Sequence, residues 1–170
     1  MNGSAESDVL GPRIRVMQII TLMLIMGAGV FIVLAVFLQL QNPNPPPDVP
    51  VVTYVGFAFG AMQLIALLIV PAQFEKSGRR QLGRPAGDGM DADERVGRLC
   101  GIRQTSLIIG NALLEGGAFF FVIAYLAEGQ ALALLTAVLF VCLLIARFPT
   151  RGRLDQWIRR QEELIAQQQA

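Results

Sequence analysis

One carboxylate, Glu115, lies inside the otherwise apolar stretch Asn-Ala-Leu-Leu-Glu-Gly-Gly-Ala-Phe-Phe-Phe. If this stretch crosses a membrane, a charge near the bilayer centre costs at least about 2.5–3.5 kcal/mol, which makes such residues rare and commonly functional. No Lys, Arg or His lies at comparable depth in the other apolar segments. Desolvation without a counter-charge disfavours the ionised form of a carboxyl. We therefore expect Glu115 to be protonated at rest and to need hydrogen-bond partners.

Two polar side chains are candidate partners for Glu115. Asn111 lies one helical turn earlier on the same face, and Gln63 lies at similar depth in an earlier apolar segment. Glycines accompany these positions, and small residues let membrane helices approach closely. These glycines are Gly56, Gly60, Gly116 and Gly117. We predict a proton- or ion-binding site of Glu115, Asn111 and Gln63 between the second and third spans, with the glycines as helix-packing positions.

The composition indicates an integral membrane protein. Of the 170 residues, 54% are hydrophobic and only 16% are charged. Uncharged stretches cover residues 16–40, 51–70, 104–127 and 131–146. A spanning helix needs roughly 17–25 apolar residues, so the first three qualify directly. The fourth reaches spanning length if its helix begins at Glu128, and we predict an all-α, four-helix membrane bundle.

The positions of the basic residues predict the orientation. All 14 Lys and Arg residues lie before the first span, between the second and third, or after the fourth. The positive-inside rule therefore places both termini and the middle segment in the cytoplasm, at a bacterial-type inner membrane. The predicted parts are a cytoplasmic N-terminal segment (1–15), a helical hairpin (16–70), a partly mobile cytoplasmic loop (71–103), a second hairpin (104–146) and a cytoplasmic amphipathic tail helix (147–170).

The connections differ in character. The proline-rich link 41–50 is expected to be extended, and the link 128–130 is short enough to force a tight antiparallel hairpin. In the middle loop, the glycine-rich residues 78–90 are expected to be mobile. Asp91, followed three residues later by Glu94, is typical of a capping box and predicts a helix that begins near Ala92.

The two halves of the chain resemble each other. Residues 14–38 align without a gap with residues 102–126, and Glu115 then corresponds to Gly27. The identical pairs are Ile14/Ile102, Arg15/Arg103, Ile20/Ile108, Gly29/Gly117, Phe31/Phe119 and Leu38/Leu126. The alignment predicts two pseudo-repeated hairpins related by an axis along the membrane normal.

The tail after the fourth span has apolar residues on one helical face and charges on the other. Trp157, Arg159 and Arg160 predict contact with the membrane interface. The alternative is a helical contact with another subunit or with the middle loop. The basic clusters either bind anionic lipid headgroups or only fix the topology.

Residues 112–126, Ala-Leu-Leu-Glu-Gly-Gly-Ala-Phe-Phe-Phe-Val-Ile-Ala-Tyr-Leu, resemble the ion-carrying helix of the proteolipid subunit c of rotary ATP synthases and ATPases. In that family an A-x-x-E pattern, followed by small and then bulky apolar residues, supplies the glutamate that carries a proton or sodium ion. The resemblance implies this role for Glu115. The glycines at 56 and 60 are similar to the glycine-rich partner helix of the family, whose cytoplasmic loop is much shorter than 71–103.

The sequence favours a membrane role over an enzymatic one. It contains no nucleophile–base pair, phosphate loop or nucleic-acid motif. With no His and two separated Cys, it lacks the ligands of a zinc site, and no cofactor is expected. We expect an oligomeric polytopic protein, bound to the lipid bilayer and to copies of itself or a membrane-complex partner, in which Glu115 binds a proton or small cation. Alternatively, it is a structural or accessory subunit in which Glu115 is only an interhelical hydrogen-bonding clamp.

Overall fold

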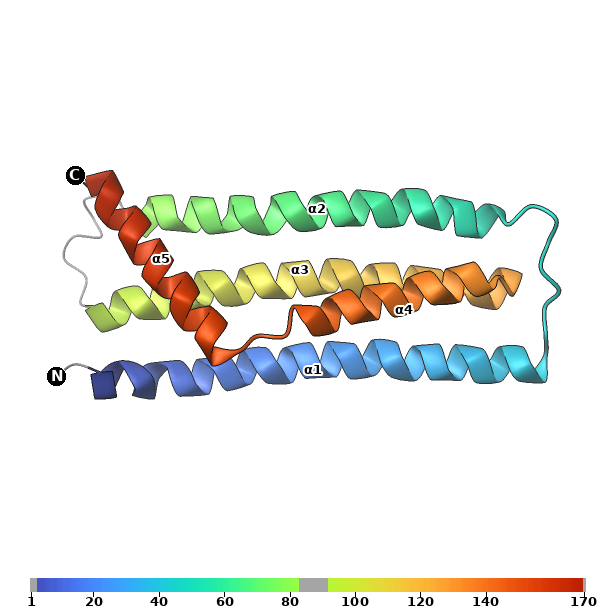
Figure 1. Ribbon diagram of the computed structural model, residues 1–170, viewed down its shortest axis with the longest axis horizontal. Coiled ribbons are helices and arrows are strands. Elements are labelled where there is room, and N and C mark those ends of the chain that lie inside the picture. The colour runs from blue at the N-terminus through green and yellow to red at the C-terminus, as the bar shows by residue number, and fades with distance from the viewer. Residues whose placement is uncertain (1–2, 83–91, 170) are drawn as a thin grey trace. The chain divides into compact units, whose positions relative to one another are not determined.

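The computed structural model describes residues 3–82 and 92–169, and within them every regular element is an α-helix. The helices are α1 (Gly3–Gln41), α2 (Val51–Leu82), α3 (Ala92–Glu128), α4 (Ala131–Ala146) and α5 (Arg151–Gln169), as labelled in Figure 1.

Three of the described helices are long and apolar enough to cross a membrane. The qualifying stretches are Ile14–Gln41, Val51–Gly78 and Val96–Glu128. A fourth candidate exists only if α4 and Arg151–Gln161 are counted together as one broken span. With 16 residues, α4 alone is roughly 24 Å long, shorter than a hydrocarbon core of about 30 Å.

The helix limits differ from those predicted at three places. Helix α1 extends back into the predicted N-terminal segment, and α2 continues through residues 71–82 of the predicted loop, because charged residues end a membrane span without ending a helix. The condition under which the fourth segment reaches spanning length is not met, since Glu128 is the last residue of α3 and α4 covers Ala131–Ala146. Helix α3 is helical from Ala92, but Asp91 and most of the stretch predicted to be mobile lie outside the described residues.

The chain divides into two compact units, which we describe separately. The first comprises the described residues of Met1–Ile20, Ile69–Ile109 and Pro149–Ala170, and the second comprises Thr21–Leu68 and Gly110–Phe148.

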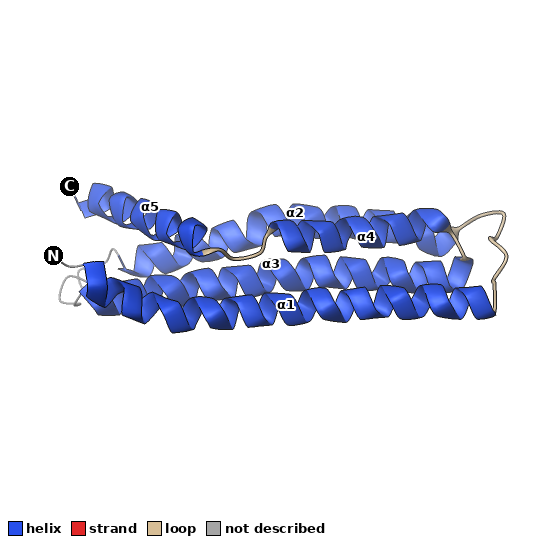
Figure 2. Ribbon diagram, turned by 60° about the horizontal axis from the view of Figure 1, so that its bottom comes forward, coloured by secondary structure: helices blue, strands red, loops and turns tan. Residues whose placement is uncertain are grey.

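The second unit is built around α3. In both views its segments of α1, α2, α3 and α4 run side by side (Figure 1 and Figure 2). Half of the most apolar stretch of α3 is buried, against 17% in α1 and 22% in α2. The fully buried core residues come from α1, α3 and α4, and are Ala28, Ala35, Leu114, Ala118, Phe121, Val122, Ala124, Ala133, Ala137, Phe140 and Leu144.

Large apolar side chains cover much of the outside of this unit. Val33 and Leu68, for example, are 70% and 76% exposed. Such side chains on α1, α2 and α4 would form a far larger apolar surface than a monomeric soluble protein tolerates. Such a surface is suited to the hydrocarbon interior of a lipid bilayer.

At one end of the second unit, Glu128 joins α3 to the start of α2. Its carboxylate accepts hydrogen bonds from the backbone N–H groups of Val52 and Thr53, at 2.6 and 2.9 Å, and from Thr53 Oγ1 at 2.6 Å. The first N–H groups of a helix have no partner within it, so Glu128 caps α2 from another helix. At the same end, Asn44 Nδ2 donates to the carbonyl of Leu126 at 2.9 Å.

In the first unit, α5 packs onto α1, α2 and α3. Its Leu154 and Ile158 are buried in a cluster completed by Ile14, Val96, Leu99 and Cys100. Leu154 and Ile158, on the apolar face of α5, are thus covered by this chain's own helices.

A polar group holds the same helix in place. Glu75 of α2 accepts hydrogen bonds from Trp157 Nε1 at 3.1 Å, from Arg103 Nη1 at 2.6 Å and from Ser106 Oγ at 2.8 Å. The Arg103 guanidinium also lies 5.4 Å from the centre of the Trp157 ring, within cation–π range.

Candidate functional site

Glu115 lies on the side of α3 that faces α1. Its side chain is half-buried, and a methyl group added at Gly27 of α1 would lie 3.7 Å from Glu115 Oε1. No residue that the structure describes forms a hydrogen bond or ion pair with the Glu115 carboxyl. The position on α1 nearest to the carboxyl group is thus a glycine, which has no side chain to form a hydrogen bond with it.

Asn111, one turn before Glu115, is almost completely buried. Its Nδ2 atom donates a hydrogen bond to Thr21 Oγ1 of α1 at 3.1 Å. Its Oδ1 atom is buried and has no hydrogen-bond partner among the described residues. Asn111 and Glu115 therefore share the α1-facing side of α3, and Asn111 provides a polar clamp there.

Gln63 of α2 is also buried, but it meets a different side of α3. Its Nε2 and Oε1 atoms lie 3.2 and 2.7 Å from where methyl groups added at Gly116 and Gly117 would be. Each residue turns an α-helix by about 100°, so Gly117 points roughly 200° away from Glu115. Gln63 Oε1 likewise has no partner within the described part of the chain.

The structure therefore brings together two of the three predicted site residues. Asn111 and Glu115 lie at the α1–α3 contact, whereas Gln63 lies where α2 meets the glycines of α3. The prediction of one site between the second and third spans is corrected on this point. The physical reason is the packing of Gly116 and Gly117, which directs the opposite side of α3 toward α1.

Aromatic rings occupy the space beside three of the four predicted helix-packing glycines, and the fourth, Gly116, faces the Gln63 amide. A methyl group at Gly56 would lie 2.9 Å from Phe120 and 3.0 Å from Phe121, and one at Gly60 would lie 3.0 Å from Phe121. At Gly117 an added methyl group would collide with the ring of Phe140. These glycines make room for side chains of the facing helix.

The Arg147 guanidinium lies nearer to Glu115 along the length of α3 than the sequence suggests. Arg147, at the end of α4, extends its guanidinium to α3, where Nη2 would be 2.9 Å from a methyl group at Gly110. Gly110 precedes Glu115 by five residues, which is roughly 7.5 Å along the helix and about 140° around it. A long side chain reaching along the helix accounts for this position.

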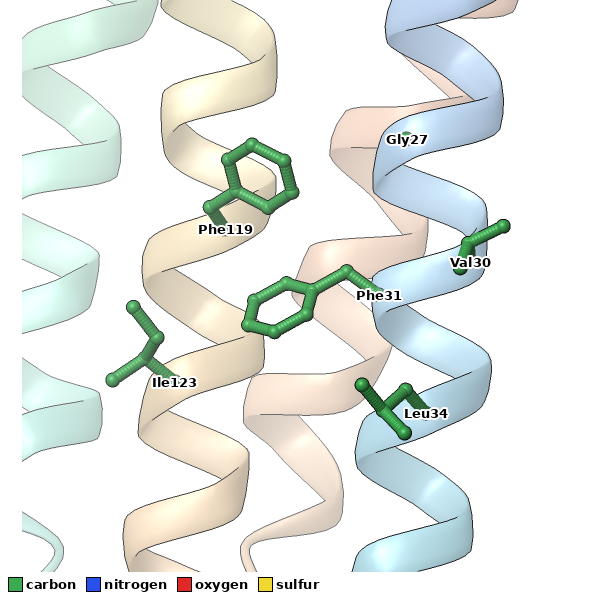
Figure 3. Close-up of a pocket in the computed structure, with 6 residues that line it drawn as sticks. All are labelled: Gly27, Val30, Phe31, Leu34, Phe119 and Ile123. Atoms are coloured by element: carbon green, nitrogen blue, oxygen red, sulfur yellow. The ribbon is translucent and has the colours of Figure 1, made fainter.

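An apolar groove lies between α1 and α3 of the second unit (Figure 3). It has a volume of about 440 Å³ and no charged residue in its lining. The rings of Phe31 and Phe119 meet edge to face there, with centres 5.3 Å apart. Gly27 connects the two features, because it lines the groove and faces the Glu115 carboxyl. The lining residues are Gly27, Val30, Phe31, Leu34, Phe119 and Ile123.

The remaining predicted residues lie on α5. Trp157 is half-buried against Glu75, whereas Arg159 and Arg160 are exposed. Their contact with a membrane interface stays a prediction. Sequence reasoning missed Glu128 and Glu75 as hydrogen-bonding centres, although a carboxylate at the end of a span, level with the start of another helix, is a usable signal.

The residues that the structure describes contain no group of three or more His, Cys, Asp or Glu side chains that could hold a metal ion. The groups that the structure places around this site are one carboxyl group, buried amide oxygens and apolar surface.

Comparison of the chain with protein-family models, with curated proteins and with solved structures gives no match. The local resemblance of residues 112–126 to the ion-carrying helix of subunit c stays a prediction.

Proposed function

We propose that this chain is a polytopic membrane protein with four spans, organised as a four-helix bundle of two repeated hairpins. The length and apolar character of α1, α2 and α3 support the spans. Contacts in the second unit support the repeat: Phe31 and Phe119, which are equivalent in the alignment of the two halves, touch each other, and Gly27 faces its equivalent Glu115. Contacts between equivalent positions are typical of helices related by a two-fold axis.

The topology that we propose places both termini and the middle segment in the cytoplasm of a bacterial-type inner membrane. The distribution of Lys and Arg supports this orientation. Arg159 and Arg160 are exposed on α5, where they are available to anionic lipid headgroups.

The function that we propose is binding and release of a proton or small cation by Glu115, as a step in transport or coupling by an oligomeric protein. The observation that carries this proposal is the isolation of the carboxyl group: it is half-buried, faces Gly27 and has no hydrogen-bond partner among the described residues. A carboxyl without fixed donors can change its protonation state without breaking a contact that holds the helices together. The resemblance of residues 112–126 to subunit c agrees with this role.

The second candidate is a structural or accessory subunit. The hydrogen bond from Asn111 to Thr21 favours it, because this bond already links α1 and α3. In that case Asn111, rather than Glu115, is the polar clamp. Neither candidate involves catalysis, and we assign the chain no enzymatic activity.

A proton titration of the purified protein tests the proposal. Wild type and Glu115→Gln would be titrated over the same pH range in the same detergent, with size-exclusion profiles to show that assembly is retained. We expect the wild type to bind up to one proton per chain more than Glu115→Gln, because glutamine keeps the shape and cannot titrate. Equal proton binding by two well-assembled proteins would leave only the structural role.

A further inference from the structure

We propose that the groove between α1 and α3 and the Glu115 carboxyl together form a binding site for a lipophilic organic cation. Such a ligand carries a single positive charge on an aromatic or branched apolar body. Because this binding depends on the proposed exchange of a proton at Glu115, it extends that function by naming a substrate class.

The shape of the site indicates an apolar body. The groove volume of about 440 Å³ falls within the roughly 300–1,000 Å³ of small-molecule sites. Its lining is aliphatic and aromatic, and Figure 3 shows Phe31 and Phe119 between the two helices. A hydrated inorganic ion would find no side-chain oxygen along this lining.

The charge at one end indicates a cation. Glu115 is not one of the lining residues, but a methyl group at Gly27, which lines the groove, would lie 3.7 Å from Glu115 Oε1. A ligand that extends past Gly27 would therefore meet this carboxyl group. A positive charge is attracted both to an ionised carboxylate and to the faces of aromatic rings. The acyl chain of a lipid gains nothing from this carboxyl group. A lipid headgroup belongs at the interface rather than at the depth expected of Glu115.

Charge balance couples the ligand to the proton. When a monovalent cation binds, the carboxyl group releases its proton and the site stays neutral. When the proton returns, the ion pair is lost and the cation is released. The neighbouring segments of the second unit supply no carboxylate to take this proton: residues 21–41 of α1 have no ionisable side chain, residues 51–68 of α2 have only Tyr54, and residues 131–148 have only Cys142 and Arg147. On α3 itself, Glu128 lies roughly 20 Å further along the helix.

The test is equilibrium binding of tetraphenylphosphonium to the purified full-length protein in nanodiscs, with neutral triphenylphosphine oxide as the comparison ligand. We expect saturable binding of the cation, at least tenfold weaker binding to Glu115→Gln, and at least tenfold weaker binding to Gly27→Leu, which fills one end of the groove. Gly29→Ala is the matched control, because an added methyl group there meets nothing within 4 Å. This variant should bind like the wild type.

Carbodiimide modification of Glu115 separates the possible failures. Protection by tetraphenylphosphonium supports the site. Modification that depends on pH and is unaffected by the cation would overturn the cation site while sparing proton exchange. Absence of modification at every pH would count against both.

Three further results would also overturn the cation site. The first is equal binding of tetraphenylphosphonium to the wild type and to Glu115→Gln. The second is equal binding of the neutral ligand, which would indicate a groove for lipid chains. The third is a cross-linked dimer in which a second copy of the chain covers the groove.

Discussion

Replacement of Gly117 by alanine should loosen the core of the second unit, whereas the same change at the equivalent Gly29 should not. The added methyl group at Gly117 would collide with the ring of Phe140 and lie 2.7 Å from Gln63 Oε1, but at Gly29 it would meet nothing within 4 Å. Overpacking of a filled core typically costs about 1–3 kcal/mol. Both variants gain roughly 1 kcal/mol of helix propensity, so this gain cancels in the comparison.

The expected difference between Gly117→Ala and Gly29→Ala is therefore about 1–3 kcal/mol, roughly a 5- to 150-fold change in the unfolding equilibrium. Unfolding of the two variants in mixed micelles, followed by circular dichroism with increasing denaturing detergent, measures it. Equal unfolding midpoints for the two variants would refute the placement of Gly117 against Phe140.

Three other substitutions test separate contacts. Glu128→Ala should destabilise the start of α2 by about 1–3 kcal/mol, because it leaves buried donors without an acceptor, and faster amide exchange in the first turn of α2 would show it. Trp157→Phe removes the donor to Glu75 and should make α5 more susceptible to limited proteolysis, whereas unchanged cleavage would contradict this contact. Thr21→Val should lower stability by roughly 0.6–1.7 kcal/mol, the range for interhelical bonds in membranes, because Asn111 loses its acceptor, and an unchanged unfolding midpoint would contradict that bond.

The sequence predicts the helical class and the positions of the apolar segments because both depend on local composition. The end of α2 could not be predicted in the same way, because the loss of apolar residues after Val70 marks the end of a span and not the end of a helix. Helix α4 alone is shorter than a span, because Glu128, which would have lengthened it, belongs to α3 and caps the start of α2.

The candidate site was predicted only in part. Asn111 and Glu115 share one side of α3, because residues four apart lie on the same helical face. The partner helix could not be predicted, since apolar residues surround α3 on every side and leave its rotation to packing. Gly117, by admitting Gln63 and Phe140, directs Glu115 toward Gly27.

The central claim is that the Glu115 carboxyl exchanges a proton. It is tested most directly by the pH dependence of modification with a hydrophobic carbodiimide in the folded protein, located by mass spectrometry. Glu128 is the internal control, because it lies in the same helix and its carboxylate already accepts three hydrogen bonds. The account predicts modification of Glu115 that disappears as the pH rises, with Glu128 unmodified throughout. A Glu115 that stays unmodified at every pH, or is modified equally at all of them, would contradict it.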